Sequence, residues 1–208
     1  MITEVDICNK AIARCGGTPI DSIDGTVAQV DPLLSVEGLL CVANYALIRD
    51  VVTEDRVWSF ALSRAVLDTP DPTPPPFGYG SRFPKPADAL NVWRVKYDDI
   101  TPTYGGDIPQ PGDWRLEGNF ILANSSMIFV EYIRRMDQFG DIDLFTSQFI
   151  DSLSIRLAVE IVLPLTENAQ LYSALTQEYQ FRLVNASGID GNQAKSEIFR
   201  ASELTRVR

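Results

Sequence analysis

The chain contains no histidine among its 208 residues. Histidine is the commonest general base of enzymes and the commonest metal ligand, so its absence excludes Ser–His and Cys–His nucleophilic catalysis and disfavours a metal site. The sequence also lacks a Cys-x-x-Cys motif, a Gly-x-Gly-x-x-Gly motif, a Walker loop and an acidic loop with calcium spacing. We therefore expect no catalytic residues, no cofactor and no metal ion.

Cysteines and long apolar runs are also scarce. The three cysteines, Cys8, Cys15 and Cys41, have no disulfide-framework spacing, which indicates reduced thiols buried in a core. The apolar run Leu39–Ile48 is too short to span a membrane, and Asn44 interrupts it. The first residues lack the basic and apolar regions of a signal peptide, so we expect a protein without a membrane partner.

Positive charge is in deficit. The 18 Lys and Arg residues stand against 28 Asp and Glu residues, for a formal net charge of −10. Because affinity for phosphates comes mainly from cations, this balance argues against a surface dedicated to nucleic acid, although DNA can pass nearby without binding. Two interpretations stay open for the basic residues on or beside the expected strands: a local anion patch, or the polar face of a half-exposed sheet. These residues are Arg94, Lys96, Arg115, Arg134 and Arg135.

The strongest local signals are helical. Thr3 precedes an acidic turn and predicts a helix that ends at Gly16-Gly17. Ser35 predicts the start of a second helix, which is apolar nearly all round and is followed by the aromatic residue Trp58. One face of that helix carries Val36, Leu39, Leu40, Ala43, Leu47 and Val51. The other carries Cys41, Val42 and Ile48. Such a helix lies either at the centre of a bundle or against a neighbouring subunit.

Two further helices are expected near the C-terminus. The third begins at Thr146 or the next residue and is ended or kinked by Pro164. The fourth is capped by Asn168 and is broken by Gly188. The tail, residues 191–208, is polar and is either a frayed terminus or an arm that orders on a partner.

Strands and long loops occupy the middle of the chain. Residues 68–86 contain seven prolines and form an extended loop that carries Phe77 and Tyr79. These two side chains either contact a partner or fold back onto the core. Four strands follow, with a hairpin turn at Glu117-Gly118-Asn119. Their ranges are Asn91–Tyr97, Trp114–Leu116, Phe120–Ala123 and Met127–Arg134.

The pattern predicts a mainly helical α+β fold: a bundle of about four helices with an inserted small antiparallel sheet and long loops. Residues 1–66 and 137–190 form the bundle, residues 67–136 the insertion with its proline-rich loop, and residues 191–208 the C-terminal arm.

Paired carboxylates are the one enzymatic option that remains. Asp137, Asp141 and Asp143 cluster between the expected sheet and the third helix, and two such groups can hydrolyse a glycosidic bond. A solvated loop with a helix cap explains the same cluster. We therefore expect a non-enzyme and keep a tail-associated glycan hydrolase as the alternative.

The order of motifs resembles the tail tubular protein A family, the head-to-tail adaptors of short-tailed bacteriophages. The resemblance spans about residues 5 to 185. It rests on Asn9-Lys10-Ala11, Ala13-Arg14-Cys15-Gly16, Cys41, Tyr45, Arg49-Asp50, Trp58-Ser59-Phe60-Ala61, Arg64-Ala65, Pro86-Ala87-Asp88, Glu117-Gly118, Tyr132-Ile133, Leu157-Ala158, Glu160 and Pro164-Leu165-Thr166.

This resemblance implies a structural protein of the virion tail, made in the host bacterial cytoplasm. Copies would form a twelve-fold ring between the portal protein and the tail nozzle, with tail fibres attached and with DNA passing through the lumen without specific binding. A head-completion or connector protein of a long-tailed phage is a further alternative. The residues that we expect to contact partners are Arg49, Asp50, Phe77, Tyr79, Arg200, Arg206 and Arg208.

Overall fold

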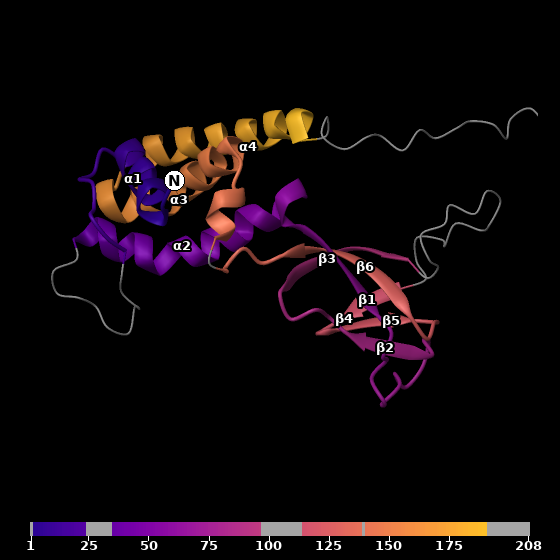
Figure 1. The fold of residues 1–208 in the computed structure, drawn as a ribbon. Coiled ribbons are helices and arrows are strands. Elements are labelled where there is room, and N and C mark those ends of the chain that lie inside the picture. Colours follow the sequence, from indigo (N-terminus) through magenta and orange to yellow (C-terminus); the bar gives the residue numbers. More distant parts are fainter. Residues whose placement is uncertain (1, 24–34, 97–113, 139, 191–208) are drawn as a thin grey trace, which may run out of the picture.

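A computed structural model describes residues 2–23, 35–96, 114–138 and 140–190. Its fold is α+β and mainly helical, as the sequence predicts. Four helices form one part, and six strands form a second part beside it (Figure 1). The chain leaves the helical part after the second helix and returns to it before the third, so the strands lie in an insertion.

Helix ends agree with the caps read from the sequence. Helix α1, Glu4–Cys15, begins with a complete capping box between Thr3 and Asp6 and ends at Gly16, whose φ of 76° suits glycine. Helix α2, Val36–Glu54, is capped by Ser35, and α3, Ser147–Thr166, by Thr146. Helix α4 is Ala169–Asp190, and the side chain of Asn168 accepts hydrogen bonds from its first backbone N–H groups.

The central helix is α3, not α2. The helix α3 packs against α1, α2 and α4, whereas α1 and α2 touch each other little. Ten of its residues are buried, Leu153, Leu157 and Ile161 among them. Two expected breaks also shift: α3 continues past Pro164 to Thr166, and α4 runs through Gly188. The prediction that Gly188 breaks the fourth helix is therefore wrong.

The strands form two three-stranded antiparallel sheets rather than one. The first sheet has the order β1-β6-β3, from Leu62–Leu67, Ile128–Arg134 and Ala89–Lys96. The second has the order β2-β5-β4, from Ser81–Pro84, Phe120–Ala123 and Trp114–Glu117. Strands β1 and β2 were not expected, and β1 begins inside the range assigned to the bundle. The β4–β5 hairpin turns at Gly118, with φ of 57°, as the sequence predicts.

Each part has its own apolar core. Side chains from both sheets meet in the smaller core, including Phe83, Val92, Ile121 and Val130. The larger core lies between the helices and reaches Trp58, which follows α2. Trp58 donates its indole N–H to the carbonyl of Val52 at 2.8 Å, so this tryptophan closes the C-terminal end of α2. The short 3-10 helices Ser59–Ala61 and Asp141–Leu144 lie at the two passages between the parts.

Candidate assembly surface

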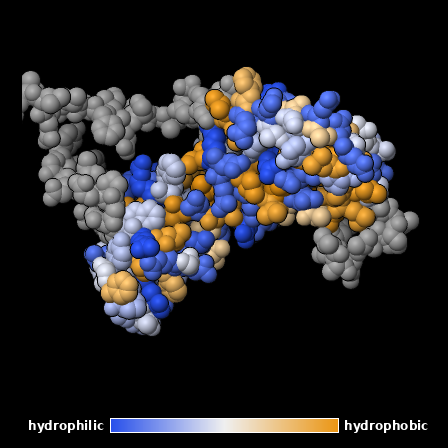
Figure 2. Space-filling model, turned by 180° about the vertical axis from the view of Figure 1, so that it is seen from behind, coloured by the Kyte–Doolittle hydropathy of each residue, from blue (hydrophilic) through white to orange (hydrophobic). Residues whose placement is uncertain are grey.

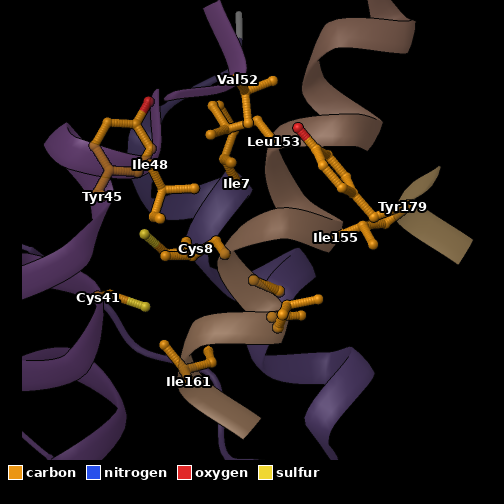
Figure 3. Close-up of a cluster of buried hydrophobic side chains, with 14 of the residues drawn as sticks. Ile7, Cys8, Cys41, Tyr45, Ile48, Val52, Leu153, Ile155, Ile161 and Tyr179 are labelled. Atoms are coloured by element: carbon orange, nitrogen blue, oxygen red, sulfur yellow. The ribbon is translucent and has the colours of Figure 1, made fainter. Parts of the chain in front are cut away.

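Helix α2 is apolar on two opposite faces, and only one of them is buried in this chain. With 100° between successive residues, the buried residues Cys41, Tyr45, Ile48 and Val52 share one side. They pack against Cys8 of α1 and against α3 (Figure 3). Cys8 and Cys41 lie on facing helices in this core.

The opposite side of α2 faces solvent. We call it the α2 stripe, and it comprises Val36, Leu40, Ala43, Leu47 and, at its C-terminal end, Glu54. Leu40 is half-buried and also packs against the core, whereas the other four residues are exposed. Val36 is 61% exposed and Leu47 63% exposed. Of the expected face that contains these residues, Val36, Ala43 and Leu47 are exposed, whereas Leu39, Leu40 and Val51 are half-buried. Cys41 and Ile48, from the other expected face, are buried in the core. Seen from behind, the helical part carries hydrophobic patches among hydrophilic ones (Figure 2).

Arg49 and Asp50, expected to contact partners, have contacts within this chain. Arg49 is buried, and its guanidinium lies 3.2 Å from the carboxylate of Asp50. That carboxylate also accepts a hydrogen bond from Nε of Arg135, at 2.9 Å, just after β6. Among the described residues, the pair therefore joins the C-terminal half of α2 to the end of the sheet; a role toward partners stays a prediction.

The proline-rich loop resolves into two different side-chain environments. Phe77 is 85% exposed, whereas Tyr79 is half-buried. The base of the loop is held by Asp71, whose carboxylate lies 2.8 Å from the guanidinium of Arg82 and also accepts the backbone N–H of Thr73. Phe77 is thus exposed on a loop whose base is held by Asp71, and its contact with a partner stays a prediction. Arg200, Arg206 and Arg208, and the C-terminal arm that carries them, lie outside the described residues.

The basic residues on or beside the strands do not gather into one patch. They are Arg94, Lys96, Arg115, Arg134 and Arg135. Arg134 pairs with the buried Asp141, Arg135 with Asp50, and Arg115 with Glu117 on the second sheet. Arg94 and Lys96 instead surround Glu131 on the first sheet, together with Arg64, which the sequence did not single out for this role.

The three acids that suggested a hydrolase are in different environments. Asp141 is buried, accepts hydrogen bonds from Arg134 and accepts the backbone N–H of Gln138. Asp143 is exposed, and Asp137 accepts a hydrogen bond from the side chain of Gln138. Asp141 therefore braces the passage from β6 to α3. Within the described ranges, no group of three or more potential ligands could hold a metal ion.

A cluster of charged residues lies between three helices, and the sequence did not predict it. Asp151 of α3 lies 3.0 Å from Lys10 and from Arg14 of α1, and 3.3 Å from Arg182 of α4. Arg14 also reaches Glu178 at 3.0 Å. Burial opposes ionisation of Asp151, but the three cations outweigh it and lower the pKa of this carboxyl. Helical spacing alone does not predict these contacts of Asp151, because each of them joins two different helices.

Four ionisable groups of the helical core, Tyr45, Tyr179, Cys15 and Cys8, are held neutral. Burial raises the pKa of Tyr45, and it raises that of Tyr179, whose hydroxyl donates to Asp55. Burial also raises the pKa of the Cys15 thiol to about 11. A hydrogen bond with Cys41, together with burial, raises the pKa of Cys8. These groups serve as packing residues at neutral pH.

None of the described helices is long and apolar enough to cross a membrane. No family model matches the chain, and no curated protein matches it.

Proposed function

We propose that this protein is a structural subunit of a homo-oligomeric ring, the head-to-tail adaptor of a short-tailed phage. The α2 stripe carries the proposal. It is a row of apolar side chains on a well-capped helix, with Val36 and Leu47 more than half exposed. A soluble protein gains free energy when such a row is covered, at about 25 cal/mol per Å² of buried apolar area.

A ring is the assembly that this surface favours. Rings close through heterologous contacts, in which one surface of a subunit meets a different surface of the next. A single-sided stripe with a core on its other side suits that geometry. The exposed Phe77, on its braced loop, suits a separate contact with another component such as nozzle or fibre.

The overall charge is compatible with a DNA channel. A formal charge of −10 per subunit, repeated around a ring, weakens the attachment of DNA to the lumen, so DNA can slide. The resemblance to the tail tubular protein A family motivates the further details: about twelve copies, a portal above, a nozzle below, and a location in the virion tail.

Electron microscopy of the full chain tests the proposal. The purified protein is imaged alone and after mixing with the portal protein of the same phage, because assembly can await the portal. Closed rings coaxial with the portal are expected. Images in which the portal stays bare at a large excess of this chain contradict the proposal. Release of sugar from host polysaccharide would instead favour the glycan hydrolase.

A further inference from the structure

The outer face of the first sheet is basic. In the strand register, both Arg64 of β1 and Arg94 of β3 stand opposite Glu131 of β6, with Lys96 two residues further along β3. The closest nitrogen–oxygen distances from these three cations to Glu131 are 3.4, 3.8 and 3.7 Å. We call these three cations, with Val66 beside Arg64, the basic face.

One carboxylate serves three cations on this face. The side chain of Glu131 is 14% exposed, whereas those of the cations are 45–77% exposed. Among the residues that the structure describes, positive charge is therefore in excess on this face of a strongly acidic chain. Val66 and Trp93 on the same sheet are also more than half exposed. Arginine, tryptophan and apolar groups side by side are the composition of protein–protein hot spots.

The α2 stripe ends in the opposite charge. Glu54, the last residue of α2, lies on the stripe and is exposed. The next residue, Asp55, accepts a hydrogen bond from the hydroxyl of Tyr179 in α4 and is not part of the stripe. The last turn of α2 holds no basic residue, so the partial negative charge of the helix C-terminus adds to the carboxylate of Glu54. The stripe is thus apolar along its length and acidic at its end.

We infer that the basic face of one copy docks on the α2 stripe of the next copy. The inference rests on the proposed ring and names the two surfaces that meet in it. Arg64, Arg94 and Lys96 meet Glu54, while Val66 and Trp93 meet the apolar part of the stripe. The two surfaces differ, so the contact is heterologous and propagates around a ring. Nucleic acid is a poorer occupant, because duplex binding rests on many phosphate contacts and this chain is acidic.

Photo-crosslinking tests the contact directly. p-Benzoyl-phenylalanine replaces Leu47 in a light-isotope copy, which is mixed with a heavy-isotope copy and irradiated. Crosslinked peptides that join one light and one heavy copy are expected to contain residues of β1 or β3. Crosslinks to other segments, or none between copies, overturn the inference. Ring formation is scored separately by microscopy. Rings together with a different crosslink refute the docking contact but not the adaptor function. The expected crosslink without rings refutes the proposed adaptor function.

A charge swap provides the second test. Arg94→Glu and Glu54→Arg are each expected to lower the crosslink yield about tenfold, as reversal of a close interfacial charge pair does, and the double variant to recover it. Arg115→Glu, on the second sheet, is the matched control and should leave the yield unchanged. Unchanged yields in both single variants overturn the inference. The inference is also overturned if Arg94→Glu abolishes DNA binding and leaves the crosslink yield unchanged, because that result assigns the basic face to nucleic acid.

Discussion

Leu47 and Ile48 are adjacent in α2 but lie in opposite environments: Leu47 is 63% exposed and Ile48 is 2% exposed. Both are aliphatic and of equal size, so the sequence does not separate them. Leu47 belongs to the α2 stripe, whereas Ile48 packs in the core beside Tyr45 and Cys8 (Figure 3). This pair gives a matched test of assembly against stability.

Ile48→Ala should lower the free energy of unfolding by about 2–4 kcal/mol, because it leaves a cavity in a packed core. Leu47→Ala should change it by less than about 0.5 kcal/mol, because the side chain is exposed. The order reverses for assembly: Leu47→Ala should reduce the yield of rings on the portal. Urea unfolding followed by circular dichroism measures the first quantity and electron microscopy the second. A stable Leu47→Ala variant that forms rings at the normal yield counts against the α2 stripe as a subunit contact.

The tryptophans provide a second contrast. Trp58 is buried, donates to the carbonyl of Val52 and meets the ring of Phe149 edge-on at 5.1 Å between centroids. Trp58→Phe should cost about 1–3 kcal/mol of unfolding free energy, since a buried carbonyl loses its donor and the core loses volume. Trp93→Phe, on the exposed side of β3, should cost less than about 0.5 kcal/mol. Equal losses of unfolding free energy in the two variants, measured by urea unfolding, would contradict a stabilising role of Trp58 at the C-terminal end of α2.

Asp151 should be the most sensitive surface acid of the bundle. Asp151→Asn leaves Lys10, Arg14 and Arg182 close together without their shared carboxylate. We expect a loss of about 1–2 kcal/mol, above the usual value for an exposed ion pair because one acid serves three cations on two other helices. Asp143→Asn, at an exposed position, is the control and should be neutral. The measurement is the urea midpoint at neutral pH in low salt. An Asp151→Asn variant with an unchanged midpoint would show that the cluster does not stabilise the fold.

The same cluster predicts a pH dependence. The folded protein holds the pKa of Asp151 below its ordinary value of 3.8. The unfolded chain therefore binds this proton more readily than the folded chain does. The stabilisation is fully present above about pH 4 to 5 and is lost as the pH falls through 3.8 and then through the lower folded pKa. The stability gap between the natural chain and Asp151→Asn should thus narrow between pH 5 and about pH 2. A gap that stays constant over this range would exclude ionisation of Asp151 as its source.

Local sequence signals predicted where the helices begin better than where they end. Thr3, Ser35, Thr146 and Asn168 each cap a helix, because a side-chain oxygen near free backbone N–H groups needs only neighbouring residues. The turn at Gly118 is local for the same reason.

The sequence predicted strands less well than helices where the two paired strands are far apart along the chain. Strand β1 pairs with β6, more than 60 positions further along the chain. Strand β2 pairs with β5, where Ser81 stands opposite Ala123 and Pro84 opposite Phe120. A register shift between Val92 and Arg94 also breaks the regular alternation of inward and outward side chains in β3, so Trp93 is exposed while Val92 and Val95 are buried. Period-two patterns assume a regular pleat, and an irregularity of this kind becomes visible only once the neighbouring strand is in place.

The sequence by itself determined the helices, their caps, the mainly helical α+β class and the insertion of strands between two helical halves. These follow from local hydrogen bonding and from apolar spacing within a segment. Only the tertiary structure decided which side of α2 is buried, since both sides are apolar and the choice depends on where α1 and α3 pack. It also decided the convergence of Lys10, Arg14 and Arg182 on Asp151, because three helices must meet before these charges come within reach of one another.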